Sequence, residues 1–369
     1  MKVMKHLAMK TLIAVLVVAL PVSALAYEIN DKLSIGGVLA GAYQYQAVDN
    51  DEDKGRGAVP FQVEMSFTPD QNNEFFAKFG FAAGNGLNDQ TSFTLAPWAA
   101  DLEDDVKDIN GRNRDYLLTA WYKYTFQFGE EHTLGLTGGI IDATDYLDEN
   151  AYANDEYTQF MNEALVNGPH VFLPSYDIGG VFEWEISNFS VRGVIMNPGE
   201  NDDGSSYQFY GAQLGYTLIS PLGEGNYRVI VDRTSKQFLN KQGEDKKHLM
   251  AGGLSFDQQL GDIFGAWIRF GWQDDKAGVD YDAIYSGGIN ISGSLWKREN
   301  DNIGLGYAYL NGGNLDMDQT QVFEGYYRLV LNEYLAVTAD VQYMKDDYKD
   351  SSEPEPKGVI LGFRATAEF

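Results

Sequence analysis

The segment Gly358–Phe369, GVILGFRATAEF, decides the fold because its side chains alternate strictly in character. The apolar set is Val359, Leu361, Phe363, Ala365, Ala367 and Phe369. The residues between them are small or mostly polar and include Arg364 and Glu368. A β-strand has a side-chain period of two, so this strand has one apolar face and one mostly polar face. An apolar face that runs to the final Phe369 needs an apolar solvent, and we expect that solvent to be lipid.

The amino terminus has the features of a secretory signal peptide. Lys2, Lys5 and Lys10 precede the apolar stretch Thr11–Leu20, and Ala24-Leu25-Ala26 is an A-x-A cleavage site. An uncleaved anchor helix is the alternative, but the stretch is shorter than the roughly 20 apolar residues of a helical span. We therefore predict a cleaved signal peptide at 1–26 and a single domain at 27–369.

The composition narrows the class of protein. The chain has 40 Gly, 23 Tyr, 21 Phe and 6 Trp, which suits strands with aromatic girdles, and it has no Cys. Without the three Lys of the signal peptide, 24 basic and 54 acidic residues remain, a formal charge of −30. This charge argues against nucleic acid as a partner, because phosphate contacts need a basic patch. The acidity has two interpretations, which are solvated loops and a dedicated cation site.

Period-two alternation recurs along the whole chain and predicts sixteen strands. Their ranges are 32–45, 60–69, 73–84, 115–128, 132–142, 177–187, 189–197, 206–218, 224–233, 248–257, 261–272, 280–294, 301–311, 321–331, 334–344 and 358–369. Short connections alternate with long ones, such as 85–114 and 143–176. This pattern predicts an all-β protein, a transmembrane antiparallel β-barrel of about 16 strands. A soluble β-sandwich or propeller is disfavoured because it would expose these apolar faces to water.

A barrel of this size is too wide for its own side chains to fill, so it encloses an aqueous channel. The longest loop, Ala143–Tyr176, is rich in apolar residues such as Tyr146, Phe160 and Leu165. These side chains need a surface to pack against, which predicts that the loop folds into the lumen, with a helical turn near Asn162–Val166. An ordered extracellular lid is the alternative.

Two stretches resemble a known family. GGIIDATDYLDENAYANDEYTQFMNEALVNGP, Gly138–Pro169, is similar to the signature of the carbohydrate-selective porins of the OprB type, and EGYYRLVLNEYLAVTADVQYM, Glu324–Met344, resembles the second-to-last hairpin of that family. The resemblance implies a channel for passive, sugar-favouring diffusion across the outer membrane of a Gram-negative bacterium. It also assigns four loop residues to the constriction, namely Asp145, Asp148, Tyr152 and Asn154.

Strand alternation also predicts which side chains face the lumen. The basic ones are Lys78, Lys123, Arg192, Arg228, Arg269, Arg328 and Arg364. The acidic ones are Glu64, Glu183, Glu185, Asp232, Glu324 and Asp340, and the aromatic ones are Trp121, Trp267 and Tyr326. Charged groups and aromatic rings suit the hydroxyls and C–H faces of sugars.

Each of these groups also has a structural interpretation. The charges could pair across strands of the wall to avoid unpaired burial. Arg328 with Glu324, and Arg228 with Asp232, also lie four residues apart on one strand, which makes pairing along the wall plausible. The two tryptophans could contact the folded-in loop instead of a sugar.

Other functions are weighed on the same residues. A general or ion-selective porin is the main rival, whereas an outer-membrane enzyme lacks support because no G-x-S-x-G or H-E-x-x-H motif occurs. A structural barrel or adhesin is a third alternative. We expect no resident cofactor, although the acidic cluster of Asp49, Asp51, Glu52 and Asp53 has oxygen ligands of the kind that Ca²⁺ prefers. The expected partners are mono- or oligosaccharides, other small hydrophilic solutes, membrane lipid and lipopolysaccharide. The sequence leaves open whether the barrel is a monomer or a homotrimer.

Overall fold

The computed structural model describes residues 27–49, 52–129, 131–166, 168, 172–201, 203–350 and 355–369. The predicted signal peptide lies outside the described residues and remains a prediction.

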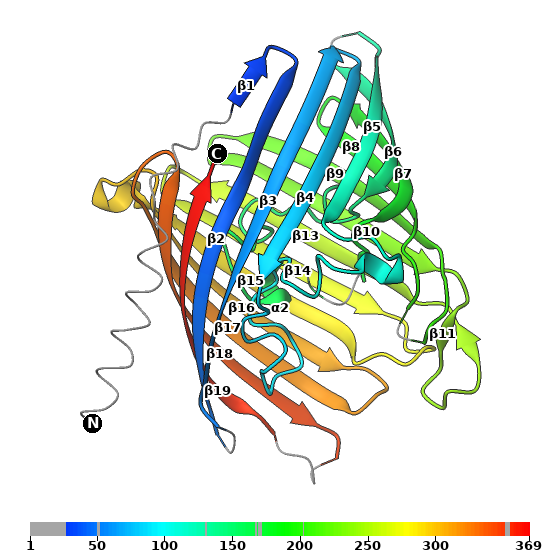
Figure 1. The fold of residues 1–369 in the computed structure, drawn as a ribbon, viewed down its shortest axis with the longest axis vertical. Coiled ribbons are helices and arrows are strands. Elements are labelled where there is room, and N and C mark those ends of the chain that lie inside the picture. The colour runs from blue at the N-terminus through cyan, green and yellow to red at the C-terminus, as the bar shows by residue number, and fades with distance from the viewer. Residues whose placement is uncertain are drawn as a thin grey trace.

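Sixteen strands of the described chain form a closed antiparallel barrel (Figure 1). They are Leu33–Val48 (β2), Lys54–Asp70 (β3), Asn73–Ala83 (β4), Leu117–Gln127 (β5), His132–Ile141 (β6), Asp177–Ile186 (β7), Phe189–Asn197 (β8), Phe209–Ser220 (β9), Gly223–Thr234 (β10), Met250–Leu260 (β13), Phe264–Gln273 (β14), Tyr281–Ser292 (β15), Asn302–Gly312 (β16), Met317–Val330 (β17), Leu335–Tyr348 (β18) and Lys357–Glu368 (β19). All sixteen predicted strands are confirmed, with shifts at their ends. A short strand, Tyr27–Asn30 (β1), pairs with β2.

The last strand closes the barrel. β19 pairs with β2 from Gly358 opposite Val48 to Glu368 opposite Val38, so both edges of the sheet are hydrogen-bonded to each other. Closure is required in hydrocarbon, where an open edge would leave backbone groups without partners.

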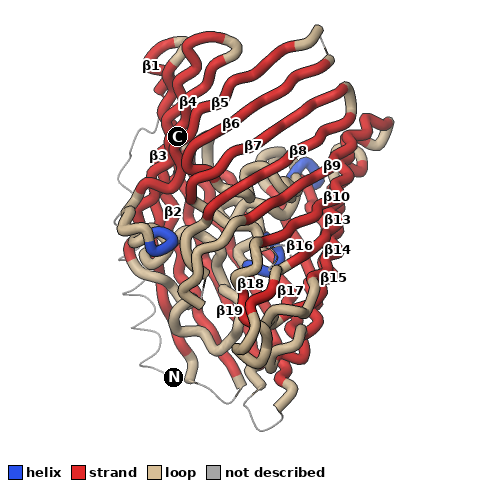
Figure 2. Tube along the Cα trace, turned by 90° about the vertical axis from the view of Figure 1, so that its right-hand side faces the viewer, coloured by secondary structure: helices blue, strands red, loops and turns tan. Residues whose placement is uncertain are grey.

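Short turns gather at one end of the barrel and long loops at the other (Figures 1 and 2). The tight turn at Ser187, which joins β7 to β8 between Ile186 and Phe189, is confirmed, and Ser187 adopts a left-handed φ of 53°. The loops carry a small hairpin, Phe238–Leu239 (β11) with Lys246–Lys247 (β12), and three short helices, Ile109–Gly111 (η1), Glu163–Val166 (α2) and Gly293–Trp296 (η3). None of the helices in the described part of the chain is long and apolar enough to cross a membrane.

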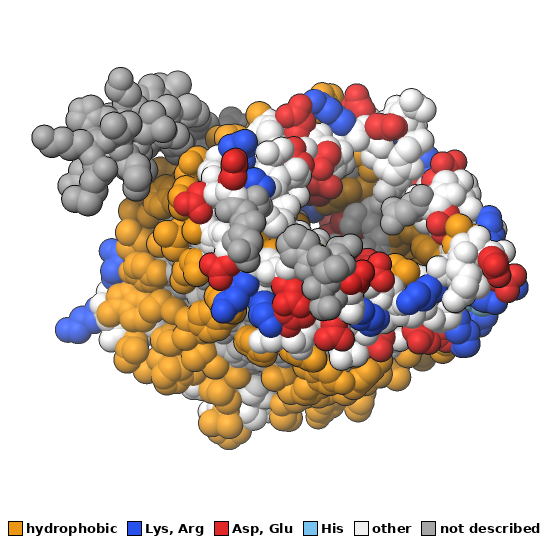
Figure 3. Space-filling view, turned by 90° about the horizontal axis from the view of Figure 1, so that it is seen from below, with side chains coloured by type: hydrophobic (Ala, Val, Ile, Leu, Met, Phe, Trp, Pro, Cys, Tyr) orange, Lys and Arg blue, Asp and Glu red, His pale blue; other side chains and the backbone are white. Residues whose placement is uncertain are grey.

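The outer wall of the barrel is apolar. On β19 the side chains of Leu361 and Phe363 are exposed on the outside, whereas Ile360, Arg364 and Thr366 of the other face are buried inside. The same contrast recurs around the barrel, and hydrophobic side chains cover the visible flank in Figure 3. This surface has the character of a lipid-facing wall.

Strand β5 departs from simple alternation at Leu118. Alternation assigns Leu118 to the outer face of β5, but it is fully buried and packs on Val106 and Ile109 inside the barrel. The pairing of β4 with β5 shifts at this point, since Lys78 lies opposite Thr119 and Phe79 opposite Leu117. The extra residue of this bulge turns Leu118 inward beside Thr119.

The interior is occupied by two loops rather than one. The long loop, residues 142–176 between β6 and β7, folds into the lumen as predicted: the Phe160 ring lies edge-on to the rings of Trp267 and Tyr326, 5.8 and 5.1 Å away. Burial of a side chain such as Phe160 contributes about 1.5–3 kcal/mol, which helps to offset the entropy lost when the loop is ordered.

The second loop, residues 84–116 between β4 and β5, also folds inward. Its Trp98 is buried against Tyr157 and Met161 of the long loop and against the barrel wall at Ala40 and Ala58. The backbone N–H of Ala99 donates to the carbonyl of Met161 at 2.8 Å, so the two loops form one layer. We call residues 84–116 the companion loop.

Candidate functional site: the constriction inside the barrel

Several residues of the predicted lumen face hold the long loop in place, and the first three of them are Arg364, Arg269 and Glu324. Arg364 of β19 donates to the carbonyl oxygens of Glu156 and Gln159 at 2.6 and 2.8 Å. Arg269 of β14 donates to the Leu165 carbonyl at 2.8 Å and pairs with Asp148 at 2.7 Å. These guanidinium groups are fully buried. Their N–H groups are hydrogen-bonded to the backbone of the loop.

Glu324 is the third anchor of the long loop. Its two carboxylate oxygens accept the backbone N–H groups of Met161 and Asn162 at 2.5 and 2.9 Å. Asp340 lies on the adjacent strand and accepts from Gln342 at 3.1 Å. The buried Asp232 has no hydrogen-bond partner among the described residues.

The remaining inward cations pair across the wall. Lys123 lies 2.6 Å from Glu183, Arg228 lies 2.6 Å from Asp257, and Arg328 lies 2.5 Å from Glu368. Arg192 pairs with Glu185 at 3.7 Å and also with Glu149 of the long loop. The suggested pairings along one strand, Arg328 with Glu324 and Arg228 with Asp232, are wrong. Residues four apart on a strand are separated by about 13 Å, whereas neighbouring strands lie about 5 Å apart and strands with one strand between them, such as β17 and β19, about 10 Å apart.

The three predicted aromatic residues contact other rings. Trp267 and Tyr326 are covered by Phe160, and Tyr326 also accepts a hydrogen bond from Asn302 at 2.9 Å. Trp121 stacks on Phe76 with ring centroids 5.0 Å apart. The structural interpretation of the two tryptophans holds for Trp267, which contacts Phe160 of the folded-in loop, and Trp121 packs against a cluster that includes Tyr146 and Leu147 of the same loop.

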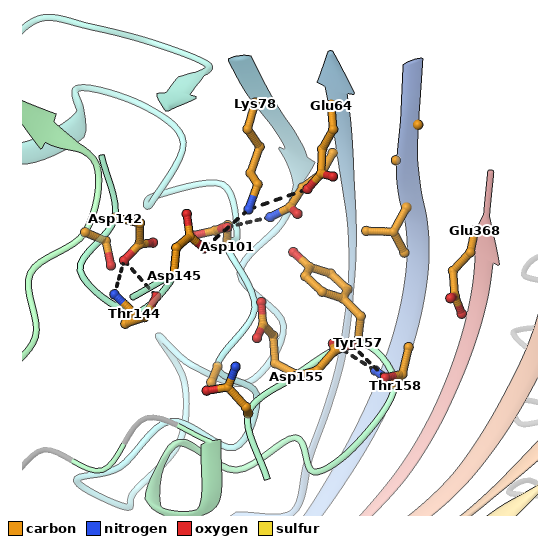
Figure 4. A pocket seen from close by; sticks show the side chains of 18 of the residues that line it. Glu64, Lys78, Asp101, Asp142, Thr144, Asp145, Asp155, Tyr157, Thr158 and Glu368 are labelled. Atoms are coloured by element: carbon orange, nitrogen blue, oxygen red, sulfur yellow. Dashed lines mark hydrogen bonds and ion pairs between the residues drawn. The ribbon is translucent and has the colours of Figure 1, made fainter. Parts of the chain in front are cut away.

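A cavity of about 710 Å³ lies between the two inward loops and the wall formed by β2, β3, β4 and β19 (Figure 4). Of the seven predicted inward cations, Lys78 lines it, with its ammonium group 3.5 Å from Glu64 and 4.0 Å from Asp145. Asn154 also lines this cavity.

The other two predicted constriction residues lie elsewhere. Asp148 is held against Arg269, and the ring of Tyr152 lies over Gly265. A Cβ at position 265 would come within 2.2 Å of that ring, so the close approach requires glycine there.

Sequence reasoning missed most residues of this cavity, among them Asp101, Tyr157 and Tyr176. The Tyr176 hydroxyl donates to Asp101 at 2.7 Å, and the amide of Gln62 donates to the same carboxylate at 2.6 Å. Shielding from bulk water raises the pKa of Asp101 to about 6, against the opposing effect of the Tyr176 hydrogen bond. The inward fold of the companion loop could have been predicted from its sequence, because its Leu87 and Trp98 are too apolar for a solvated loop.

A second cavity of about 360 Å³ adjoins the first. Both are lined by Ala99, Asp101, Ser175 and Tyr176, so the Asp101–Tyr176 hydrogen bond lies where the two cavities meet. Since Asp101 belongs to the companion loop and Tyr176 to the long loop, this bond also ties the two loops together.

The acidic cluster near Asp49 shows ordinary hydrogen bonding. Asp53 accepts a hydrogen bond from Tyr45 at 2.7 Å, and Asp51 lies outside the described residues. Within the described ranges, no group of three or more His, Asp or Glu is arranged to hold a metal ion. Binding of Ca²⁺ at this cluster stays a prediction.

A closed barrel of sixteen strands with an apolar outer wall and loops folded into its lumen defines an outer-membrane porin, a multi-pass β-barrel protein. The model of the carbohydrate-selective porin, OprB family, matches residues 82–369, and the chain belongs to this family.

Individual similar proteins agree with this assignment. An uncharacterized protein of Aquifex aeolicus (strain VF5) is 33% identical over 300 residues, which are 80% of this chain and 84% of that protein. The high-pH structure of Pseudomonas putida OprB has a similar fold, with a TM-score of 0.71 and 15% identity over 93% of this chain and 95% of that chain. The outer membrane channel DcaP of Acinetobacter baumannii has a TM-score of 0.58 and 10% identity, over 94% of this chain and 99% of that chain.

Proposed function

We propose that this porin favours the passive diffusion of sugars. The observation that carries the proposal is the 710 Å³ cavity between the two inward loops, whose lining is dense in hydrogen-bonding side chains. The family name points to the same class of solute. Both the family and the fold are those of a channel, which is not a class of enzyme.

The chemistry of the cavity suits polyols. Its carboxylates accept hydrogen bonds from sugar hydroxyls, and the ammonium group of Lys78 donates to them. Tyr157 and Tyr176 contribute aromatic rings, against which the C–H faces of a sugar can pack. Affinity has to stay weak, because a site that holds its solute tightly stops conducting.

The path that we propose uses both cavities. A solute enters past the exposed Asp104 and Lys107 of the second cavity, passes the Asp101–Tyr176 pair and reaches the larger cavity. That cavity extends to Glu368 and Phe369 at the short-turn end of the barrel. Contacts of the outer wall with lipid and lipopolysaccharide, and assembly as a homotrimer, stay predictions.

Single-channel conductance of the refolded protein in planar bilayers tests the sugar assignment. Glucose and maltose are titrated in at neutral pH, and we expect saturable block of the ion current by both sugars. A steady current that neither sugar changes would leave the porin intact and make it a general porin.

A further inference from the structure

We propose that the outer wall of the barrel carries a binding site for the phosphate groups of lipopolysaccharide, centred on Arg233 at the long-loop end of β10. The site lies on the outside of the barrel. It is therefore independent of the solute that the channel passes.

The first feature of this site is the charge of the segment 233–248, which includes the β11–β12 hairpin. Of the 24 Lys and Arg that follow residue 26, five lie in this segment together with two acids, a net charge of +3 (5 − 2) in a chain of −30. The hairpin lies at the long-loop end, at the lower right of Figure 1, and basic side chains lie along the right-hand rim in Figure 3. Long loops of outer-membrane barrels face the outside of the cell. The segment therefore borders the outer leaflet, where clustered Lys and Arg attract anionic headgroups.

The second feature is the direction of Arg233. Val231 is exposed on the outer wall and Asp232 is buried inside, so the exposed Arg233 is the next outward residue of β10. Tyr210 of β9 and Met250 of β13 lie directly opposite it, and both are exposed on the same wall. The guanidinium group thus extends from the lipid-facing surface at the end that borders the headgroups.

The hydrogen-bond partner of Arg233 is neutral. Its Nη2 group donates to Nε2 of His248 at 3.2 Å, and Nδ1 of His248 donates to the Thr234 carbonyl at 2.8 Å. Because a carbonyl oxygen can only accept, the ring proton is assigned to Nδ1, and Nε2 accepts from the arginine. This hydrogen bond orients the guanidinium group without cancelling its charge.

The acids around Arg233 are held by other cations. Asp245 pairs with Lys247 at 3.1 Å, and Asp274 pairs with Lys276. Among the residues that the structure describes, no ion pair includes Arg233. A cation on a lipid-facing surface is costly without a counter-ion. Phosphate oxygens can supply one, because they accept two parallel N–H bonds from a guanidinium group.

The third feature is a gap in the side-chain layer of the wall next to Arg233. Val231, Gly252 and Trp272 lie side by side on β10, β13 and β14. A Cβ at Gly252 would contact a single atom, the carbonyl oxygen of Ile230 at 3.5 Å, so the space above the glycine is open. The exposed Trp272 borders this space on one side and Val231 on the other. An acyl chain can lie there.

The gap and the arginine are spaced for one lipid molecule. Val231 and Arg233 are two residues apart on β10, which is about 7 Å along the strand. Trp272 is of the residue type that marks the membrane interface. Lipopolysaccharide, the glycolipid of the outer leaflet, combines phosphate groups with several acyl chains, so one molecule can place a phosphate at Arg233 and a chain over Gly252.

Native mass spectrometry of the mature protein in detergent tests the site. The probes are bisphosphorylated lipid A, its dephosphorylated form and phosphatidylglycerol, each added at the same concentration. We expect one bisphosphorylated lipid A per barrel to survive collisional activation that removes the other two. Equal retention of dephosphorylated lipid A would show that the wall binds acyl chains alone. Equal retention of phosphatidylglycerol would show only a general attraction for anionic lipid, and either result would overturn the proposal.

Substitution of Arg233 locates the phosphate contact. Arg233→Gln should lower the fraction of barrels with bound lipid A at least fivefold. Arg233→Lys keeps the charge but loses the paired N–H donors, so its loss should be smaller. Lys32→Gln removes one positive charge from the exposed turn before β2, at the opposite end of the barrel, and should change nothing. Equal binding by Arg233→Gln and Lys32→Gln would contradict the proposal.

Substitution of Gly252 tests the acyl contact separately. Gly252→Leu fills the gap without a change of charge, and a Cβ at this position makes ordinary van der Waals contact, so the strand can accept it. We expect a severalfold loss of bound lipid A. Gly193→Leu on the outer face of β8, where a Cβ would also meet open space, is the matched control. Equal binding by the two glycine variants would contradict an acyl contact at Gly252. Single-channel conductance should match the parent protein in every variant, which shows that each barrel is folded.

Discussion

Glu324 illustrates how a lumen carboxylate can serve structure rather than solute. Both of its oxygens accept backbone N–H groups of the long loop, at Met161 and Asn162, and it is fully buried. Arg364 and Arg269 hold carbonyl groups of the same loop. The acidic residue of the wall therefore binds N–H groups of the loop backbone, and the basic residues bind its carbonyl groups. Together they fix the position of the loop.

Replacing Glu324 by Gln should loosen the long loop. The amide offers one acceptor oxygen, and its NH₂ group faces an N–H, so one buried donor is left unsatisfied at a cost of about 1–3 kcal/mol. We expect noisier open-channel current and a lower urea midpoint of unfolding. Glu333→Gln in the exposed turn after β17 is the control. Identical current noise in the two variants would show that Glu324 does not hold the loop.

Tyr176→Phe should weaken the tie between the two inward loops. The change removes the hydroxyl that donates to Asp101 at 2.7 Å. Because this hydrogen bond favours the charged carboxylate, its loss should raise the pKa of Asp101 above about 6. We expect a larger conductance and a pH midpoint of ion selectivity that moves upward. Tyr210→Phe on the lipid-facing wall is the control. A midpoint that stays in place or moves downward would contradict this account.

The strands follow their alternation closely because each face has a different solvent. Leu361 and Phe363 of β19 are exposed outward, whereas Arg364 is buried inward, and a shift of one residue would exchange them. The exception at Leu118 arises where the companion loop supplies Val106 and Ile109 as an apolar surface inside the barrel. At this point β5 bulges, and its inner neighbour is the companion loop.

Leu361→Arg should destabilise the barrel in a bilayer. Leu361 lies near the middle of β19 and is 54% exposed on the outer wall. Arginine at the midplane of a lipid-facing surface costs about 2–4 kcal/mol. Reversible unfolding in urea from lipid vesicles measures this cost, with Leu361→Ala as the smaller perturbation. Equal stability of the arginine variant and the parent protein would mean that this face does not contact lipid.

The whole molecule is a wide barrel narrowed by two loops that share one layer. Neither loop forms the constriction alone, because Asp101 comes from the companion loop and Tyr176 and Asp145 come from the long loop. The wall supplies Lys78 and Glu64 from adjacent strands, β4 and β3. Solute choice therefore depends on the assembled barrel and not on any single segment.

Ion selectivity should depend on pH between about 5 and 7. The pKa of Asp101 is raised to about 6, first by shielding from water and also by Asp105, while Tyr176, Lys78 and Gln62 lower it. Burial also raises the pKa of Asp145, which faces Lys78. As the pH falls through about 6 these carboxyls gain protons and lose charge, so the permeability ratio of K⁺ to Cl⁻ should decrease. Reversal potentials measured across this pH range give the ion selectivity at each pH. Asp101→Asn should make the selectivity depend less on pH. A preference that grows in acid would refute the assignment.

The number of strands, the two-faced strand at Gly358–Phe369 and the inward fold of residues 143–176 could all be predicted from the residues alone. Period-two alternation is a local property of each strand. The apolar residues of a loop also show, from the sequence alone, that the loop packs against another surface. The inward positions of Lys78, Glu64 and Arg364 followed from the same alternation. The partners of these residues did not follow from it, because Lys78 and Glu64 meet across neighbouring strands whose register is a property of the sheet, and Arg364 binds carbonyl groups of the long loop.

The cavity could only come from the tertiary structure. Asp101, Tyr157 and Tyr176 belong to loops without a period, and 75 positions of sequence separate Asp101 from its hydrogen-bond donor Tyr176. Their meeting depends on Trp98 packing against Tyr157 and on Arg364 and Glu324 holding the long loop. Local pattern thus fixes which face of each strand meets lipid, because that choice is made residue by residue. The lining of the channel is decided when the closed barrel brings distant loops to one place.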